Sequence, residues 1–170
     1  MARRIRSRND LGRDLLKGAI AGAVATFVMS KVTSYIYELQ DPDAREQEDE
    51  ARGGATSYEA AAERAASAAG TELDRRGRER YGAAIHWGVG MGAGAVYAVL
   101  RRRFQMFGTA GGTMFGTAFW TFLDEGLVPA LGITPGPQAF PWQTHARGLV
   151  GHLTFGTVTD GTLRLLDRVA

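Results

Sequence analysis

The stretch 119-FWTFLDEGLVPALGITPGPQAFPWQTHARGLVGHLTF-155 decides the fold of this 170-residue chain. Apolar, helix-forming sequence enters and leaves it, whereas its middle carries prolines at positions 129, 135, 137 and 141. Proline lacks a backbone N–H and restricts the residue before it, so we predict a hairpin between two helices. Most of the candidate chemistry flanks this hairpin: Asp124, Glu125, His145, Arg147 and His152.

The composition is ordinary on average, but the charges are segregated. Hydrophobic residues make up 45% and charged residues 22%, yet no Asp, Glu, Lys or Arg occurs within 81–100 or 104–123. The absence of cysteine excludes disulfides, thiolate zinc sites and cysteine nucleophiles. The net charge is only +2, so we expect no nucleic-acid partner.

Four segments are predicted to cross a membrane: residues 15–39, 81–100, 104–127 and 144–166. About 20 residues at ~1.5 Å per residue cross a hydrocarbon core of roughly 30 Å. The basic start and the apolar run after it also fit a secretory signal peptide. However, that run continues through Lys31 with helical character, so we favour an uncleaved span. We expect residues 1–170 to form a single all-α membrane domain.

Glycines recur at four-residue intervals within these segments. In lipid, small residues let helix backbones approach closely, whereas glycine inside a soluble helix costs about 1 kcal/mol relative to alanine. We therefore predict that glycines pack the helices together, namely Gly18, Gly22, Gly88, Gly92, Gly108, Gly112 and Gly116.

The polar residues 40–80 are predicted to form a helical excursion outside the membrane, between the first two spans. Thr56-Ser57-Tyr58-Glu59 has the form of a capping box and should open an alanine-rich helix that ends near Ala69. Thr71 can cap a second helix that leads into the next span.

Arginine predicts the orientation of the bundle. The basic first 17 residues, the Arg101–Arg103 turn and the C-terminal arginines fall on one side. The acidic segment 41–50 and the nearly uncharged segment 126–144 fall on the other. Cytoplasmic loops carry an excess of Lys and Arg, so both termini are expected inside. Four arginines between residues 75 and 80 run counter to this rule, but they follow a longer loop with acids nearby.

This topology brings six ionisable residues into the outer half of the bundle: His86, Asp124, Glu125, His145, Arg147 and His152. Such a cluster can bind a metal, ligate haem, relay protons, or close the bundle as a hydrogen-bond network. No H-E-x-x-H or C-x-x-C-H motif is present, and no nucleophile–base pair can be assembled from spacing. We therefore assign no catalytic, cofactor-binding or metal-binding residue and expect no enzyme activity.

The hairpin resembles the P-x-x-G-x-T-P…P-W…G-H pattern of the YagU-like inner-membrane proteins. The matching residues are Pro129, Gly132, Thr134, Pro135, Pro141, Trp142, Gly151 and His152. His86-Trp87 and the pair Lys31 and Glu38 also lie where that family has similar residues. The chain departs from the pattern after the first span, where Asp41-Pro42-Asp43-Ala44-Arg45 replaces the expected P-P-R step.

The resemblance implies a small bacterial inner-membrane protein that contributes to acid tolerance. We therefore predict a non-enzymatic, multi-pass protein of the bacterial cytoplasmic membrane, linked to envelope or acid stress. Its expected partners are the lipid bilayer and either a second copy of the chain or another membrane protein. The alternatives are a metal- or haem-binding redox module and a small channel or proton pathway.

Overall fold

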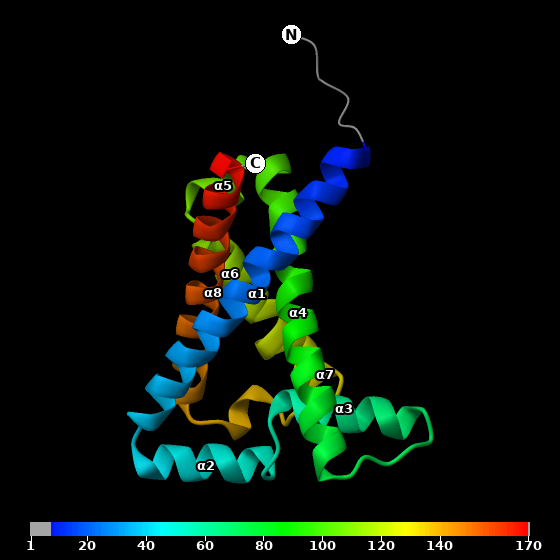
Figure 1. The fold of residues 1–170 in the computed structure, drawn as a ribbon. Coiled ribbons are helices and arrows are strands. Elements are labelled where there is room, and N and C mark those ends of the chain that lie inside the picture. Colours follow the sequence, from blue (N-terminus) through cyan, green and yellow to red (C-terminus); the bar gives the residue numbers. More distant parts are fainter. Residues whose placement is uncertain (1–7, 170) are drawn as a thin grey trace.

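The computed structural model describes residues 8–169, without the side chains of residues 8–10, 105 and 109, and within this range its only regular secondary structure is helical. The arginines at positions 3, 4 and 6, which contribute to the predicted orientation, lie outside the described residues. Three long helices dominate the fold: α1 (Arg8–Glu38), α4 (Arg75–Arg103) and α8 (Trp142–Val169). They cover the predicted first, second and fourth spans (Figure 1).

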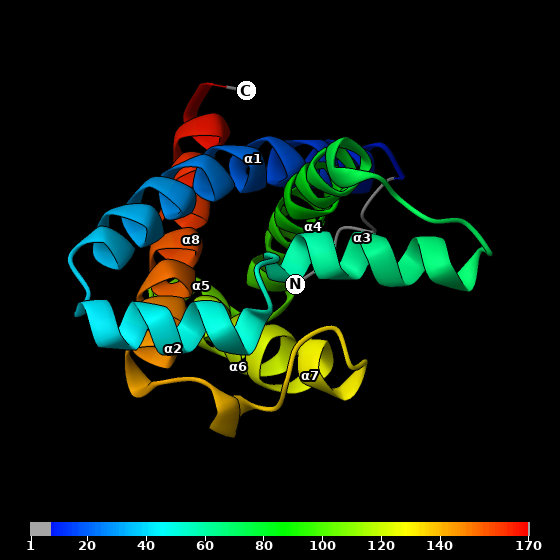
Figure 2. The ribbon, with the colours of Figure 1, turned by 90° about the horizontal axis from the view of Figure 1, so that it is seen from below.

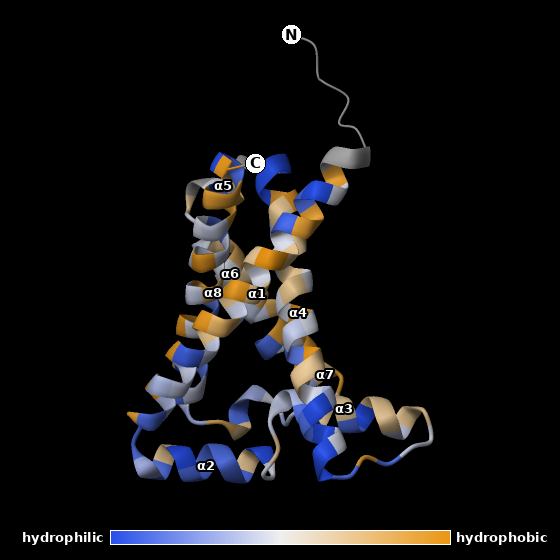
Figure 3. Ribbon diagram, in the orientation of Figure 1, coloured by the Kyte–Doolittle hydropathy of each residue, from blue (hydrophilic) through white to orange (hydrophobic). Residues whose placement is uncertain are grey.

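Two helices in the described range, over Leu11–Glu38 and Arg75–Arg103, are long and apolar enough to cross a membrane. Only 28% and 22% of their most apolar windows are buried, whereas a core helix of a soluble protein is mostly buried. Large apolar side chains are exposed along both, including Leu16, Ile20, Phe27, Trp87 and Val96. Figure 3 shows hydrophobic residues in the long helices and hydrophilic ones along α2.

The third predicted span is wrong at its start. Residues 104–127 do not form one helix, because α5 (Gln105–Thr109) ends in a turn where Gly111 and Gly112 have φ of 58° and 83°. A new helical path then runs through α6 (Thr113–Phe122), the π-helical turn η1 (Leu123–Leu127) and α7 (Val128–Ala130). It continues past Pro129, which occupies the first turn of α7, where its missing N–H costs nothing. The hairpin follows, with a short 3₁₀ turn η2 (Pro137–Ala139).

The excursion contains α2 (Pro42–Arg52) and α3 (Ser57–Ala68). The capping box at Thr56 is confirmed, since its hydroxyl accepts from the Glu59 N–H and the Glu59 carboxylate accepts from the Thr56 N–H. The predicted cap at Thr71 is wrong, because the helix that leads into the second span begins at Arg75 and is capped by Asp74, as the first part of α4. Helix α2 was not predicted, although Asp41 followed by Pro42 is a typical helix start.

Helix α1 is central because it packs against both α4 and α8, whose own backbones come close to each other at few positions. A Cβ added at Gly22 would lie 2.3 Å from the Gly90 carbonyl oxygen, and one at Gly94 would lie 2.3 Å from that of Gly18. Near the hairpin end, Gly151 of α8 packs on the Met29 and Thr33 side chains of α1.

The glycine prediction is partly corrected by this packing. Gly18 and Gly22 contact α4, while Gly112 and Gly116 contact the backbone of α8 at Gly156 and His152. By contrast, no atom of the described chain lies within 4 Å of a Cβ built at Gly88 or Gly92. The register on α4 is shifted by two residues, to Gly90 and Gly94. Gly108 lies in α5, outside the helix that carries Gly112 and Gly116.

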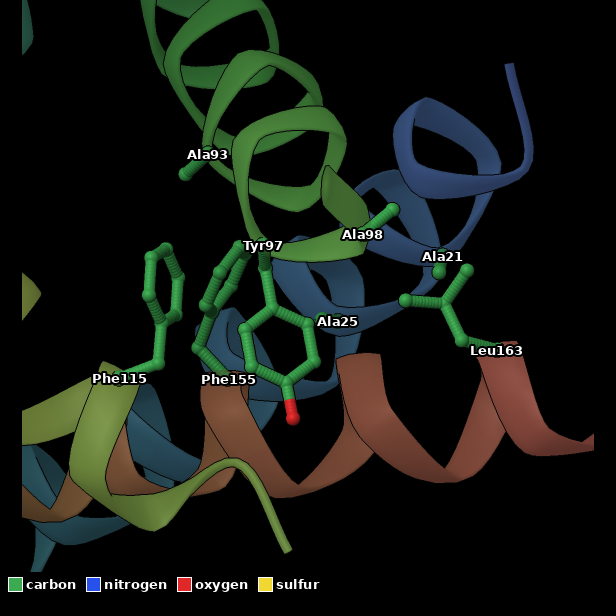
Figure 4. Close-up of a cluster of buried hydrophobic side chains, with 8 residues drawn as sticks. All are labelled: Ala21, Ala25, Ala93, Tyr97, Ala98, Phe115, Phe155 and Leu163. Atoms are coloured by element: carbon green, nitrogen blue, oxygen red, sulfur yellow. The ribbon is translucent and has the colours of Figure 1, made fainter. Parts of the chain in front are cut away.

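The hydrophobic core lies where α1, α4, α6 and α8 meet (Figure 4). Small residues of α1 and α4 surround Tyr97, which is fully buried. The ring centroids of Tyr97 and Phe115 are 4.9 Å apart. The core members are Ala21, Ala25, Ala93, Tyr97, Ala98, Phe115, Phe155 and Leu163.

The two ends of the bundle differ. We call the end that holds the described ends of α1 and α8 the terminal end, and the end bounded by α2, α3 and the hairpin the open end (Figure 1). Towards the open end, α4 diverges from α1 and α8. Figure 2 shows α2 and α3 lying across the open end, below the long helices.

Candidate functional site

A cavity of about 700 Å³ occupies the open end, and all six residues of the predicted cluster line it. Its apolar wall includes Met29, Ile85, Val89, Leu123 and Leu127. Its ionisable lining comes from every element around it. The carboxylates are Glu38, Glu48, Asp49, Asp124 and Glu125; the remaining groups are Arg52, Arg147, Tyr37, Tyr58 and the three histidines.

His145 is held between two hydrogen-bond acceptors. Its Nδ1 lies 2.7 Å from Oε1 of Glu125, and its Nε2 lies 3.1 Å from the carbonyl oxygen of Pro137. Since a carbonyl only accepts, Nε2 must carry a hydrogen. The short contact to Glu125 then needs one proton between Nδ1 and the carboxyl group, and the pair carries no net charge whichever of the two groups holds it. This pair fixes α8 to η1 and to the hairpin.

His152 lies opposite Asp124, which is the neighbour of Glu125 on η1. It is buried, and its Nδ1–H donates to the Gly148 carbonyl oxygen at 3.0 Å, while Oδ2 of Asp124 lies 3.6 Å from the same nitrogen. Asp124 and Glu125 both sit on the π-helical turn, where the wider backbone turn aims neighbouring side chains into the cavity. The carboxylate of Asp124 remains 38% exposed.

His86 has a partner on only one ring nitrogen. Ser30 donates its single hydroxyl hydrogen to the Thr26 carbonyl oxygen, so it accepts a hydrogen bond from Nε2 of His86 at 3.1 Å. Neutral His86 is therefore the Nε2–H tautomer, and its buried Nδ1 is an acceptor without a partner among the described residues. The ring of Tyr58 packs edge-on against it, with centroids 4.4 Å apart.

Arg147 does not join the histidines but binds Glu48, a residue that the sequence analysis missed. Glu48 is 2% exposed and accepts hydrogen bonds from Arg147, from Arg52 at 2.8 Å and from Thr144 at 2.7 Å. We call these four residues the Glu48 brace, because they tie α2 to α8. Burial raises the pKa of Glu48, but the bonds from Arg147 and Thr144 and the charge of Arg52 outweigh it, so the net pKa is lowered.

One sequence signal, the four-residue spacing, indicates the helix face that carries Glu48, whereas its burial is seen only in the structure. Ala44, Glu48 and Arg52 are spaced four apart, so they share one face of a helix, and Ala44 and Glu48 are both buried. Tyr58, also missed, lies in the capping-box turn of α3. Burial, then the nearby charge of Asp124, raises the pKa of Tyr58 above its ordinary value, so its hydroxyl keeps its proton at the cavity wall.

The hairpin residues have diverse positions. Pro135 lines the cavity, whereas Trp142 begins α8 with 73% exposure. Gly132 has φ of 63°, which favours glycine, and its carbonyl oxygen accepts from Arg64 of α3. Pro129 lies in α7; Thr134 and Pro141 lie in the irregular segments on either side of η2.

At the terminal end, a second polar cluster surrounds Asp160. An intrahelical ion pair joins Asp160 to Arg164 at 2.6 Å. In addition, the Tyr97 hydroxyl donates to Asp160 at 2.8 Å, and Arg101 lies 3.6 Å away. Asp167 binds Lys17 at 3.1 Å. Burial opposes the charge of Asp167, but Lys17, Arg101 and Arg102 lower its pKa overall.

The arrangement does not resemble a metal centre. No group of three or more His, Cys, Asp or Glu side chains among the described residues is placed to hold a metal ion. The three histidines line one cavity, but each has a different partner: a hydroxyl for His86, a carboxylate for His145 and a backbone carbonyl for His152. The site therefore offers proton-binding groups and charge rather than a ligand sphere.

Fold and site together define an all-helical protein with two helices able to cross a membrane and one polar cavity at their hairpin end. The chain belongs to the family described as "Protein of unknown function (DUF1440)", whose model matches residues 68–161. The match includes all six cluster residues and the whole hairpin, but neither α1 nor α2. Comparisons with curated proteins and with solved structures gave no match.

Proposed function

We propose that this chain is a non-enzymatic protein of the bacterial cytoplasmic membrane that spans the bilayer four times and responds to external acid through its cavity. The exposed apolar faces of α1 and α4 support two spans. The path from Thr113 to Ala130 supplies 18 residues, or about 27 Å at ~1.5 Å per residue, and α8 supplies 28 residues. Both are long enough to cross most or all of a hydrocarbon core.

The charge distribution supports an orientation with both termini inside. Lys17, Arg101–Arg103, Arg164 and Arg168 gather at the terminal end. Acidic α2 lies at the open end, which would face outward, so the cavity would open to the external medium. The exposed step of Gly88 and Gly92 on α4 supports a second copy of the chain, or another membrane protein, as a lateral partner.

The topology can be tested by labelling. Single cysteines replacing Ala51, Pro137 and Ala170 should react differently with a membrane-impermeant thiol reagent in intact spheroplasts. Labels are expected at positions 51 and 137, whereas position 170 should react only after permeabilisation. A label at position 170 together with protection at position 51 would reverse the orientation.

The cavity and its three histidines carry the acid response. Histidine gains charge between about pH 5 and 8, so external acid changes the charge of a site that opens outward. The surroundings of two histidines differ usefully: His152 has the Asp124 carboxylate 3.6 Å away, whereas His86 contacts the neutral Ser30 and Tyr58. Protonation of His152 is therefore compensated, while protonation of His86 meets desolvation without a paired carboxylate.

His152→Ala and His86→Ala form a matched pair for this response. Thermal unfolding in detergent should show that His152→Ala lowers the melting temperature more at pH 5 than at pH 8, because the charged His152–Asp124 pair is lost. His86→Ala should do the opposite, because it removes a histidine whose charged form is unfavourable. Penalties that are the same at both pH values would reject the acid response.

The channel alternative is less well supported. Between His152 and Asp160 lies a chain of ring contacts, from Phe119 to Phe155 and Phe115, with centroids 5.1 to 5.8 Å apart. This apolar layer favours a cavity closed towards the terminal end over a continuous proton path. A proton flux in proteoliposomes that depends on His152 would favour the channel instead.

A further inference from the structure

The cavity carries an excess of negative charge. Among the described residues that line it, five carboxylates face two guanidinium groups. The proton shared by His145 and Glu125 makes that pair neutral overall, because both ring nitrogens of His145 face acceptors. With His86 and His152 neutral, the net charge is about −2. This charge is enclosed in a site whose walls are largely aliphatic and aromatic, where charges interact more strongly than in water.

Asp124 and the exposed Glu38 are the two lining carboxylates that accept no hydrogen bond from the described residues. Glu48 has three hydrogen-bond donors, Asp49 accepts from the Tyr37 hydroxyl at 2.9 Å, and Glu125 is paired with His145. The basic group nearest to Asp124 is His152, whose Nδ1 lies 3.6 Å away, and that N–H is already directed to the Gly148 carbonyl oxygen. A half-buried carboxylate without a close donor favours a cationic ligand.

The size and walls of the cavity specify what kind of cation fits. A volume of about 700 Å³ lies in the range that accommodates drug-sized organic molecules. Leu123, Ile85 and Val89 offer an apolar surface, while Trp120 and Tyr58 offer aromatic rings that attract cations. A hydrated metal ion would leave this apolar surface unused, whereas an organic cation would bury its body there.

Protons would compete with such a ligand. Nδ1 of His86 is a buried acceptor without a partner among the described residues, and Nε2 of neutral His152 is likewise the nitrogen that takes up a proton. Protonation of both would cancel the net charge of about −2. The site would then hold either protons or one organic cation strongly, but not both.

We propose that the cavity binds a monovalent organic cation with an apolar body, that Asp124 is its counter-ion, and that protonation of His86 and His152 displaces it. The inference rests on the proposed function only for the outward opening of the cavity and for the titration of these histidines.

The direct test uses tetraphenylphosphonium, a permanent cation, with tetraphenylborate, an anion of the same shape, as its control. Calorimetric titration of the full chain in neutral detergent at pH 8 should show at least tenfold tighter binding of the cation. Lowering the pH to 5.5 should weaken cation binding at least tenfold. Equal affinity for the two ions would reduce the result to partition into apolar surface and would overturn the proposal.

Asp124→Asn should weaken binding of tetraphenylphosphonium at least tenfold. The matched control is Glu63→Gln, which removes the same charge from an exposed site on α3 and should leave affinity unchanged. Unchanged affinity in a folded Asp124→Asn variant would refute the role of Asp124. If that variant does not fold, the comparison of the two ions in the wild-type chain still decides the proposal.

The outcomes separate this inference from the proposed function. No cation binding, together with opposite pH effects of His152→Ala and His86→Ala, would reject the ligand and keep the acid response. Cation binding with pH-independent effects of both histidine variants would keep the ligand and reject the acid response.

Discussion

The terminal and open ends of the same bundle are held together by different means. At the terminal end, backbones touch: Gly94 lies against Gly18, and Gly112 lies against Gly156. At the open end, α4 diverges from α1 and α8, and side chains of the Glu48 brace bridge the distance from α2 to α8. Close backbone packing involves no titratable group, whereas the brace depends on an ionised carboxylate. The terminal end also has ion pairs of Asp160 and Asp167, so we infer that the two ends differ in backbone packing, which is close at the terminal end, whereas side chains join α2 to α8 at the open end.

Of the variants that test this difference between the two ends, Gly112→Leu is expected to lower the free energy of unfolding most. A Cβ at Gly112 would lie 2.0 Å from the Gly156 carbonyl oxygen, and its φ of 83° is unfavourable for leucine. The free energy of unfolding should fall by at least about 3 kcal/mol. Gly161→Leu on α8 is the matched control, because no described atom lies within 4 Å of its Cβ position.

Circular dichroism in detergent during chemical denaturation measures both glycine variants. Gly161→Leu should be unchanged or slightly more stable, since leucine is a better helix former than glycine by under about 1 kcal/mol. Similar losses for the two variants would contradict the assignment of the terminal end as the closely packed region.

A smaller effect is expected for Glu48→Gln at the open end. Loss of the carboxylate leaves Arg147 of the brace without its charge partner in a buried setting, which should cost about 3 kcal/mol at pH 7. Arg75→Ala, which breaks the exposed pair with Glu79, should cost about 0.5 kcal/mol or less.

The pH dependence of Glu48→Gln separates the brace from packing. Because the folded pKa of Glu48 is lowered, its stabilisation is complete above the ordinary carboxyl pKa and is lost as pH falls through the folded value. Denaturation at pH 7 and at pH 3 should therefore show a smaller penalty at pH 3. A penalty that stays constant with pH would mean that Glu48 acts through shape alone.

The sequence could predict the long helices and the gathering of the six cluster residues, because periodicity and charge segregation are local signals. It placed α1, α4 and α8 to within a few residues at most ends, although α1 and α4 begin six or more residues earlier than expected. It could not predict the break at Gly111–Gly112, since glycines at four-residue spacing fit both a helix ridge and a left-handed turn. The prediction of which α4 glycines pack against α1 was wrong for a related reason. The overlapping glycine steps at 88–92 and 90–94 are equivalent in sequence, so spacing alone does not choose between them.

Only some residues of the candidate site could be predicted from the sequence. Histidines and acids beside the hairpin are conspicuous in an apolar segment, and these do line the cavity. Glu48 lies in a segment rich in acidic residues, and the sequence does not distinguish it from its neighbours. Its burial, which does distinguish it, is seen only in the structure. The proton positions of His86 and His145 depend on which partners lie opposite, which is long-range information that spacing does not contain.

The crossing of α1 between α4 and α8 sets an order for biogenesis. Helix α1 is made first, but its last partner, α8, begins 104 residues after α1 ends. At about 5–20 residues per second, this segment takes roughly 5–20 s to synthesise. Throughout that interval, the face of α1 around Met29 and Thr33 lacks its packing partner, Gly151. In the proposed membrane topology, the half-built protein depends on lipid or on the insertion machinery to cover this face, and synthesis of the final helix completes the assembly.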